Sequence, residues 1–501
     1  MGIGYSRGVA VVGVGGHVVD VEVDSGNGLP ATHIVGAGDA ALHEARERVR
    51  AAIVNSGFPY PPGKVVISLS PASLRKTGSG FDLAIVAAVL SSRGHIPAGT
   101  LSGVALVGEL ALDGRVRPVR GVLPAVLAAR EAGLSAVLVS SGNLAEARLV
   151  DGIASIGLRT LEDLRDYCLG LEPPDYPVAE QGGAVHPNDA DSADLVDVRG
   201  QPEARRAVEI AAAGGHNLLL LGPPGTGKTM LARRLPGLLP DLCEGDALST
   251  TAVHSVSGVL GEGRSPLVSR PPFIAPHHTA SMNALVGGGH GLARPGAVSL
   301  AHNGVLFLDE APEFAARTLD ALRTPLEEGT VRIARRDGVT EFPARFQLIM
   351  AANECPCGAA EAARCDCPAG LRRRYMAKLS GPLRDRLDIC VRTSPVGVRL
   401  LSDTDQESTA TVRERVHRAI ECATARRSVP AQNSDAATKV EDGISRTAMI
   451  PLKRGLVRGA ISARGARRCL RLAWTLADID GSNSPTQHHV VEAMTLRGDE
   501  I

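Results

Sequence analysis

The segment that most restricts the fold of this chain is GPPGTGKT, which spans Gly222 to Thr229. It follows the apolar run NLLLL and leads into MLARRL, whose composition favours a helix. A G-x-x-x-x-G-K-[ST] pattern between a buried strand and a helix is typical of a loop whose backbone N–H groups surround phosphates. We therefore expect an α/β domain with a parallel sheet that binds a nucleoside triphosphate at this loop.

The loop positions have separate expected roles. Glycines let the backbone wrap the phosphates, and the start of the following helix adds positive potential. Lys228 is expected to reach the β- and γ-phosphates, and the Thr229 hydroxyl group is expected to hold Mg²⁺. The predicted nucleotide-binding residues of the loop are Gly222, Pro223, Pro224, Gly225, Thr226, Gly227, Lys228 and Thr229.

Two further apolar runs end in polar residues. GVLFLDE places Asp309 and Glu310 at the end of one expected strand, and FQLIMAAN places Asn353 at the end of another. We expect Asp309 to hold Mg²⁺, Glu310 to polarise the attacking water and Asn353 to orient that water. The alternatives are a helix cap for the acidic pair and a plain surface position for the asparagine.

Composition narrows the class of protein. A chain of 501 residues is long enough for two or three domains. Basic and acidic residues balance at 54 each, so a nucleic-acid site must be a local patch, and 3% aromatic residues disfavour base stacking as the main binding mode. The chain has no long apolar run and no secretory leader pattern, and its nine cysteines are unevenly spread. These features favour a cytoplasmic protein without a membrane span.

The chain divides into four expected stretches. Residues 1–170 alternate β-rich and helical runs and predict an α/β or α+β domain. Residues 171–194 are rich in proline, glycine and acidic residues and predict a linker. Residues 195–395 alternate helices with short buried strands, which predicts a parallel sheet covered by helices. Residues 396–501 have a helical period and many arginines.

The three strand ends together resemble an AAA+ ATPase. Gly200 and Gln201 in VRGQPEARR match the adenine-side segment of that superfamily. LSGPLRDRLDI has its D-R-x-D arrangement, which implies Arg386 as an arginine finger, with Arg384 as the weaker candidate. ISARGARRCLRLAW resembles the sensor-2 helix and implies that Arg464 contacts the γ-phosphate. A finger that acts on a neighbour implies a ring of six subunits; a solvated surface arginine is the alternative for each.

Longer motifs resemble one branch of this superfamily. RPPFIAPHHTASMNALVGGG and RPGAVSLAHNGVLFLDEAPEF are similar to the Mg-chelatase-like ComM/YifB family, and the similarity covers nearly the whole chain. The segment EGTVRIARRDGVTEFPARFQLI is then expected to form a hairpin with Arg332, Arg335 and Arg336 near its tip. Such hairpins in helicase-like relatives contact the DNA backbone inside the ring. An ordinary solvated hairpin is the alternative.

The first 170 residues resemble the Lon-protease-like domain of that family, which has a ribosomal protein S5 domain 2-like fold. Lon-type proteolysis uses a Ser–Lys dyad. KTGSGFDLAIV places Ser79 about one position away from the expected serine, and Leu123 stands at the expected lysine. Leucine cannot deprotonate a nucleophile. We therefore expect no proteolysis, and a role in assembly or substrate guidance.

Four of the nine cysteines, Cys355, Cys357, Cys365 and Cys367, directly follow the third expected strand. They form two C-x-C pairs, and a loop of this length can bring four thiolates around one tetrahedral Zn²⁺. Zinc sites more often have two to four residues between paired cysteines. We expect a structural zinc ion, with reduced and metal-free thiols as the alternative.

Two basic segments are candidate phosphate contacts. One runs from Arg372 to Lys378 around Tyr375, and the other, from Gly443 to Ala477, contains eight basic residues and no acidic residue. Such segments suit salt-sensitive contacts with a nucleic-acid backbone. The alternative is that their arginines pair with carboxylates on neighbouring parts of the protein.

The resemblance implies an ATP- and Mg²⁺-dependent hexameric motor on DNA, a branch-migration helicase in recombination or natural transformation. One alternative is a chelatase motor subunit for metal insertion into a tetrapyrrole, although those subunits typically lack a Lon-like domain. Another is an ATP-dependent protease or chaperone, which Leu123 disfavours. A module that binds ATP without hydrolysis is disfavoured because Lys228, Asp309, Glu310 and Asn353 are all present.

Overall fold

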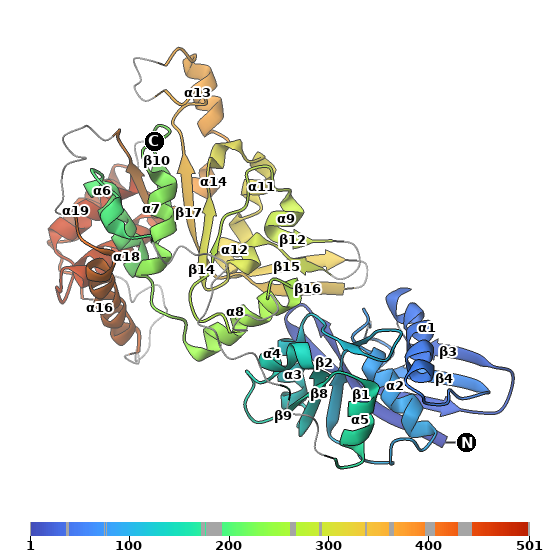
Figure 1. The fold of residues 1–501 in the computed structure, drawn as a ribbon. Helices are drawn as coiled ribbons and strands as arrows, with labels where there is room; N and C mark the ends of the chain where they lie inside the picture. Colours follow the sequence, from blue (N-terminus) through green and yellow to red (C-terminus); the bar gives the residue numbers. More distant parts are fainter. Residues whose placement is uncertain are drawn as a thin grey trace.

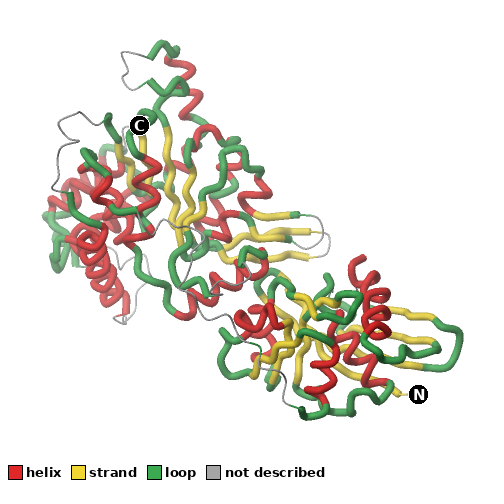
Figure 2. Tube along the Cα trace, viewed as in Figure 1, coloured by secondary structure: helices red, strands yellow, loops and turns green. Residues whose placement is uncertain are grey.

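The computed structural model describes residues 2–36, 40–74, 76, 78–171, 176, 193–260, 267–289, 293–335, 338–359, 365–395, 406–428 and 443–498. These residues form an N-terminal α/β region, a central α/β region and a set of C-terminal helices (Figure 1). Helices cover the sheets of both α/β regions (Figure 2). None of the helices in the described ranges is long and apolar enough to cross a membrane.

The N-terminal region contains two main sheets. The first has the order β1-β2-β4-β3 and is antiparallel except for the β3–β4 pair, and the second is the parallel sheet β5-β8-β9. Strand β2 alternates buried valines with exposed residues, because only one face of the strand meets the core. The elements are β1 (Gly2–Val12), β2 (Gly15–Ser25), β3 (Ala31–Val35), α1 (Ala40–Asn55), β4 (Lys64–Ser70), α2 (Asp82–Ser92), β5 (Val104–Val107), β6 (Glu109–Leu110), β7 (Val116–Arg117), α3 (Val122–Glu131), β8 (Ala136–Ser140), α4 (Leu144–Ala147), β9 (Ala154–Leu158) and α5 (Leu161–Cys168).

The central region is built on a five-stranded parallel sheet with the order β11-β14-β17-β10-β18. Strand β10 reads LLLL and is buried on both faces, as expected for a parallel strand between helical layers. Ligands of such sheets bind beyond the carboxyl ends of the strands. The elements are α6 (Pro202–Gly214), β10 (Leu218–Leu221), α7 (Lys228–Arg234), α8 (Glu244–Ser257), β11 (Phe273–Ile274), α9 (Met282–Val286), β12 (Gly287–Gly288), β13 (Arg294–Pro295), α10 (Ala297–Leu300), β14 (Gly304–Leu308), α11 (Ala316–Asp320), α12 (Arg323–Glu328), β15 (Thr330–Arg335), β16 (Gly338–Pro343), β17 (Phe346–Ala352), α13 (Ala369–Met376), α14 (Gly381–Arg384) and β18 (Ile389–Arg392).

The hairpin expected before the third strand is present. Strands β15 and β16 pair in antiparallel register, with Arg332 opposite Glu341 and Arg335 opposite Gly338 near the turn. The hairpin extends from the side of the central region (Figure 1). Arg336, which we also expected near its tip, lies outside the described residues.

The C-terminal helices pack against α6 of the central region. The longest buried face belongs to α18, whose residues Cys469, Leu472 and Leu476 share a core with Ile210. Helix α18 begins after Ser462, whose Oγ accepts a hydrogen bond from the backbone of Gly465 and so caps the first turn. The elements are α16 (Thr409–Ser428), α17 (Ile450–Val457), α18 (Ala463–Ile479) and α19 (Gln487–Arg497).

The N-terminal region contacts the central region through helices α3 and α8. Helix α8 lies between the two regions (Figure 1), and its Ala252 shares an apolar core with Leu123 of α3. The carboxylate of Glu146 accepts hydrogen bonds from the Leu123 backbone N–H (2.8 Å) and from the Ser255 hydroxyl group. Burial raises the pKa of Glu146. One buried carboxylate therefore joins the two regions.

Candidate nucleotide-binding site

The loop between β10 and α7 has the backbone shape that the sequence predicts. Gly225 and Gly227 adopt φ values of 77° and 86°, in the left-handed region that favours glycine. A Cβ atom added at Gly222 would lie 2.2 Å from Oγ1 of Thr393, so strand β18 ends directly against the loop. The hydroxyl groups of Thr393 and Thr226 share a hydrogen bond of 2.7 Å.

Lys228 connects this loop to the end of β17. Its buried ammonium group donates to the backbone oxygens of Gly222 (2.6 Å) and Pro223 (2.7 Å), and to Oδ1 of Asn353 (3.1 Å). Burial lowers the pKa of Lys228, while the nearby carboxylates of Asp309 and Glu310 act in the opposite direction. The structure therefore brings together the lysine and the asparagine that are 125 positions apart in the sequence.

Thr229 and Asp309 form the second contact across the sheet edge. The Thr229 hydroxyl group donates to Oδ2 of Asp309 at 2.6 Å, and Oδ1 of Asp309 accepts from the Glu310 backbone N–H at 2.9 Å. A hydroxyl and a carboxylate oxygen are the ligand types that Mg²⁺ takes beside a bound nucleotide. The two residues therefore fit the expected metal ion.

Glu310 has an unusual backbone. Its φ of 49° is in the left-handed region, which is uncommon for a residue other than glycine. Its exposed carboxylate lies 3.4 Å from Nδ1 of His278, and the His278 ring lies against the ring of His277 with centroids 4.1 Å apart. We did not predict these histidines as site residues. The sequence signal was their position within RPPFIAPHHTASMNALVGGG, one of the motifs that resemble the ComM/YifB family.

Gln201 contacts the phosphate loop and the segment after β18. Its Nε2 atom donates to the backbone oxygens of Thr226 (3.2 Å) and Ser394 (2.5 Å). Gly200, immediately before it, has a φ of 65°. The structure thus places these two predicted nucleotide-binding residues beside the loop.

The two arginines predicted to contact the γ-phosphate lie elsewhere. Both bind Glu327 at the end of α12: Arg386 through NH2 at 2.5 Å, and Arg464 through its own NH2. Arg464 also lies 3.4 Å from Oδ2 of Asp385. Arg384, the weaker candidate, ends α14.

This arginine pair stands at the amino edge of the sheet. The backbone oxygen of Arg386 accepts from Nδ2 of Asn217, which directly precedes β10, whereas the phosphate loop follows β10. At about 3.3 Å per residue, the two edges of this strand are roughly 15 Å apart. The backbone of Arg386 therefore lies at the edge of the sheet opposite the phosphate loop of its own chain, and its guanidinium group shares Glu327 with that of Arg464.

The other basic residues are divided between ion pairs and solvent. Exposed Arg332 in the hairpin bonds to Glu341 (3.0 Å) and Glu328 (3.3 Å). Arg468 of the C-terminal segment bonds to Asp388 at 3.0 Å. The alternative we named, pairing with carboxylates, therefore holds for Arg464 and Arg468.

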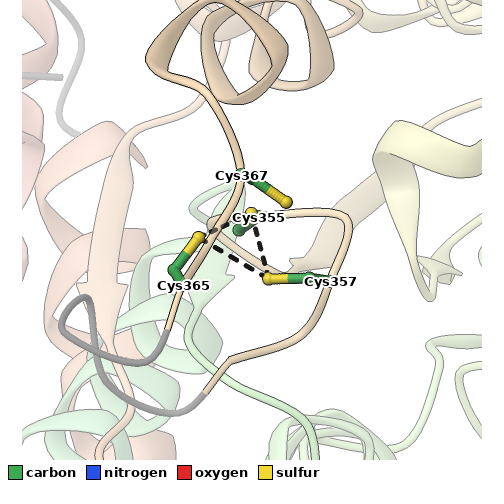
Figure 3. Close-up of side chains that lie close together, drawn as sticks. All are labelled: Cys355, Cys357, Cys365 and Cys367. Carbon is green, nitrogen blue, oxygen red and sulfur yellow. Dashed lines mark hydrogen bonds between the residues drawn. The ribbon is translucent and has the colours of Figure 1, made fainter.

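The four clustered cysteines converge (Figure 3). The sulfur atoms of Cys355, Cys357 and Cys365 lie 3.3–3.6 Å from one another, and all four lie within 4.8 Å. Thiolates 2.3 Å from one tetrahedral zinc ion are about 3.8 Å apart, whereas disulfide sulfurs are about 2 Å apart. Burial raises the pKa of Cys355, and the Ala359 backbone N–H lowers that of Cys357 to about 7. The donor set and its spacing fit a single metal ion.

The N-terminal region holds the two residues that we compared with a Ser–Lys dyad. The Ser79 hydroxyl group donates to Oε2 of Glu109. Leu123 is completely buried. Its side chain belongs to the core that meets α8, as described above.

Comparison with known proteins agrees with this arrangement. Three family models match: "Magnesium chelatase, subunit ChlI" over residues 194–400, "Subunit ChlI of Mg-chelatase" over residues 21–143 and "Magnesium chelatase, subunit ChlI C-terminal" over residues 406–497. The N-terminal match agrees with a further similarity: Lon protease of Mycolicibacterium smegmatis is 31% identical over 180 residues, which are 34% of this chain and 23% of that protein.

Full-length relatives extend the similarity. An uncharacterized protein of Mycobacterium tuberculosis is 51% identical, over 99% of each chain. The uncharacterized protein YifB of Escherichia coli is 40% identical, over 97% of this chain and 96% of its own. Competence protein ComM of Haemophilus influenzae is 39% identical, over 99% of this chain and 97% of its own. This chain therefore belongs to the ComM/YifB family of AAA+ ATPases, which has the domains of the magnesium chelatase subunit ChlI.

Proposed function

We propose that this protein is an ATP-hydrolysing motor that assembles into a six-membered ring and moves DNA, as a branch-migration helicase in recombination or natural transformation. The observation that carries the proposal is the division of charged groups between the two edges of the central sheet. The phosphate loop, Asp309 and Asn353 stand at the carboxyl edge, and Arg386 and Arg464 stand at the amino edge.

The residues at the carboxyl edge of the sheet have separate roles in ATP hydrolysis. Lys228 holds the β- and γ-phosphates, and Thr229 and Asp309 hold Mg²⁺, which neutralises phosphate charge when bound. Glu310 accepts a proton from the attacking water, and Asn353 orients that water. The contacts of Lys228 with Asn353 and of Thr229 with Asp309 support these roles, since they gather the residues around one point.

The arginine pair supports a ring. Arg386 lies at the sheet edge opposite its own phosphate loop, so for this arginine and Arg464 to reach a γ-phosphate a neighbour must be placed head to tail. Glu327 would release Arg386 and Arg464 to that neighbour's nucleotide. A head-to-tail contact that closes generates a cyclic assembly.

Three features support DNA as the substrate. The β15–β16 hairpin carries Arg332 and Arg335 at exposed positions away from the sheet. Helix α13 carries three consecutive arginines, which suit contacts with phosphates. A full-length relative bears the name competence protein, which fits a role in handling incoming DNA.

We also propose that Cys355, Cys357, Cys365 and Cys367 hold one structural Zn²⁺. The convergence of their sulfur atoms supports this assignment. Elemental analysis of protein purified under reducing conditions should find about one zinc ion per chain. A metal-free protein with four reduced thiols would contradict it.

The function is tested by measuring ATP hydrolysis with single-stranded, duplex and four-way-junction DNA, next to strand exchange on the junction. Junction DNA should stimulate hydrolysis at least several-fold. Glu310→Gln should bind ATP but lose hydrolysis by about 100-fold or more, because no carboxylate accepts the water proton.

The hairpin provides a matched comparison for the DNA role. Arg332→Ala combined with Arg335→Ala should weaken DNA binding and reduce its salt dependence. Arg93→Ala, at an exposed residue just after α2, should change neither property. An ATPase that ignores every DNA, with both variants like the wild type, would contradict the DNA motor.

A second candidate is a chelatase motor subunit for metal insertion into a tetrapyrrole. The matches to the ChlI domains over all three parts of the chain favour it. A rate of ATP hydrolysis that responds to a tetrapyrrole and its partner subunits, and not to DNA, would replace our proposal with this one. A response to unfolded protein would indicate a chaperone or protease instead.

A further inference from the structure

We infer that the loop carrying Cys355, Cys357, Cys365 and Cys367, with a metal ion bound, holds Asn353 and α13 in position, so that its metal ion sets the rate of ATP hydrolysis. We call this metal-bound loop the brace. The inference rests on the proposed ATPase and on the proposed zinc ion. It assigns this ion an effect on catalysis in addition to its structural role.

The loop begins at the catalytic strand. Asn353, whose side chain accepts from Lys228, is separated from Cys355 by a single residue. That residue, Glu354, bonds through Oε1 to Nε of Arg392 at 2.9 Å, at the end of β18. The first metal ligand is therefore covalently close to the side chain that positions the attacking water.

The loop also touches the phosphate loop. The Gly358 N–H donates to the Cys355 backbone oxygen at 3.1 Å and closes a turn in which Gly358 has a φ of 67°. A Cβ atom added at Gly358 would lie 2.8 Å from Cγ of Pro224. This turn, which contains Cys357, packs so closely on the phosphate loop that a side chain at Gly358 would require the turn or Pro224 to shift.

The far end of the loop leads into α13, which contacts the segment that follows Glu310. Tyr375 of α13 is buried, and a hydrogen bond with Glu313, three residues after Glu310, contributes to raising its pKa after the larger effect of burial. The brace therefore reaches both Asn353 and the segment that follows Glu310.

A cavity of about 430 Å³ separates these parts, and its walls come from each of them: Pro223, Asn353, Cys355, Cys365, Arg372 and Arg373. Cys355 is the only buried member of the four cysteines. Apolar packing thus contributes little to holding the described part of the loop around this cavity. Bonds from four thiolates to one ion would hold its walls in place.

Metal removal should therefore act on catalysis more than on binding. Without the ion, Asn353 and α13 lose their fixed positions, while the phosphate loop keeps its own hydrogen bonds. We expect kcat to fall about tenfold and KM for ATP to change by less than about twofold, because small misplacements of positioning groups cost rate.

The test compares three proteins: zinc-loaded wild type, wild type from which zinc has been removed, and the double variant that combines Cys365→Ser and Cys367→Ser. Zinc is removed with a chelator selective for zinc in the presence of excess Mg²⁺. Cys422→Ser, at an exposed cysteine of α16, is the matched control. Zinc content, kcat, KM, binding of a fluorescent ATP analogue and thermal unfolding are measured without DNA. Added zinc should restore stripped wild type but not the double variant.

Gly358→Ala disturbs the contact between the turn and the phosphate loop and leaves the four metal ligands unchanged. Its zinc content should stay at the wild-type level while kcat falls, because the added methyl group pushes the turn away from Pro224. The same fall in kcat in Cys422→Ser, or a decrease in activity that only follows the unfolded fraction, would overturn the inference.

Failure of the brace and failure of the proposed function have different signatures. Full hydrolysis by the zinc-free protein overturns the brace even if DNA stimulates the enzyme. Zinc-dependent hydrolysis that ignores DNA leaves the brace standing and removes the DNA motor. If the wild type hydrolyses no ATP, hydrogen exchange at residues 351–354 decides: equal protection with and without zinc overturns the brace.

Discussion

Polar residues are used differently at the phosphate-loop edge of the central sheet and at the two positions of the N-terminal region that we compared with a Ser–Lys dyad. In the central region, polar side chains from three strand ends contact one another around Lys228 and Asp309. In the N-terminal region, Ser79 bonds to Glu109, and the position expected for a lysine holds buried Leu123.

The difference shows that a position compared with a catalytic residue can serve packing between two regions instead. Leu123 packs in the core that α8 of the central region completes, and its backbone N–H binds Glu146, which also binds Ser255. A charged lysine at this buried position would carry a large desolvation cost. The position that we compared with the base of a Lon-type enzyme thus lies where the N-terminal region packs against the central region.

The largest expected effect on ATP hydrolysis is that of replacing Lys228 in the phosphate loop or Arg386 at the opposite edge of the sheet. Lys228→Ala should lower ATP hydrolysis by about 1,000-fold, and Arg386→Ala by a similar factor, since each removes a cation from the phosphate charge. A mixture of the two variants should regain part of the activity, because an intact Arg386 then faces an intact Lys228 in some neighbours. ATPase titrations of the mixture check this.

Two outcomes would contradict the proposed role of Arg386. A mixture as inactive as its components, despite verified co-assembly, would mean that Arg386 does not act between subunits. An Arg386→Ala protein with full activity would mean that Glu327 holds this arginine for structural reasons alone.

The next effect concerns Leu123. Leu123→Ala should destabilise the N-terminal region by about 3 kcal/mol, because it leaves a cavity in a fully buried core. Leu127→Ala, at a half-buried position of the same helix, should cost less. Denaturant unfolding measures both, and the ATPase rate per folded molecule should stay close to wild type. A 100-fold loss of ATP hydrolysis in the folded variant would mean that packing of Leu123 between the regions controls the nucleotide site.

A smaller effect is expected at the contact between the regions. Ser255→Ala removes one of the hydrogen bonds to the buried carboxylate of Glu146 and should cost about 1 kcal/mol. Ser257→Ala is the control, since its hydroxyl group bonds to neighbouring backbone groups of its own segment, donating to the His254 oxygen and accepting from the Val259 N–H. A double-mutant cycle with Glu146→Gln reports the coupling. Independent effects of the two substitutions would argue against a contact between regions at this point.

The smallest effect should be that of Ser79→Ala. Its hydroxyl group bonds to Glu109, and we expect neither ATP hydrolysis nor any peptidase activity to change beyond experimental error. Casein and short fluorogenic peptides serve as substrates. A peptidase activity in the wild type that disappears in this variant would mean that the N-terminal region is an active peptidase.

Much of the fold and of the nucleotide site could be predicted from local patterns. The loop from Gly222 to Thr229, Asp309 and Asn353 each follow an apolar strand, and parallel strands bring their carboxyl ends to one edge. The spacing of the cysteines predicted their convergence, because they are close together in the sequence, whereas the hairpin was implied by the resemblance to the ComM/YifB family.

Other parts of the site depended on long-range packing. His278 meets Glu310 because a loop after the edge strand β11 passes beside β14. Arg464 meets Glu327, 137 positions earlier, because the C-terminal helices pack on the central region. No local period or motif spacing specifies such pairs.

The sequence by itself therefore determined which chemical groups this protein carries and at which end of each strand they stand, since strand polarity and backbone turns are local properties. Only the tertiary structure decided that Arg386 and Arg464 both meet Glu327, that the cysteine loop packs on the phosphate loop and that Leu123 lies where two regions meet. These contacts follow from how helices and loops are buried against one another, which depends on shape and area over the whole chain.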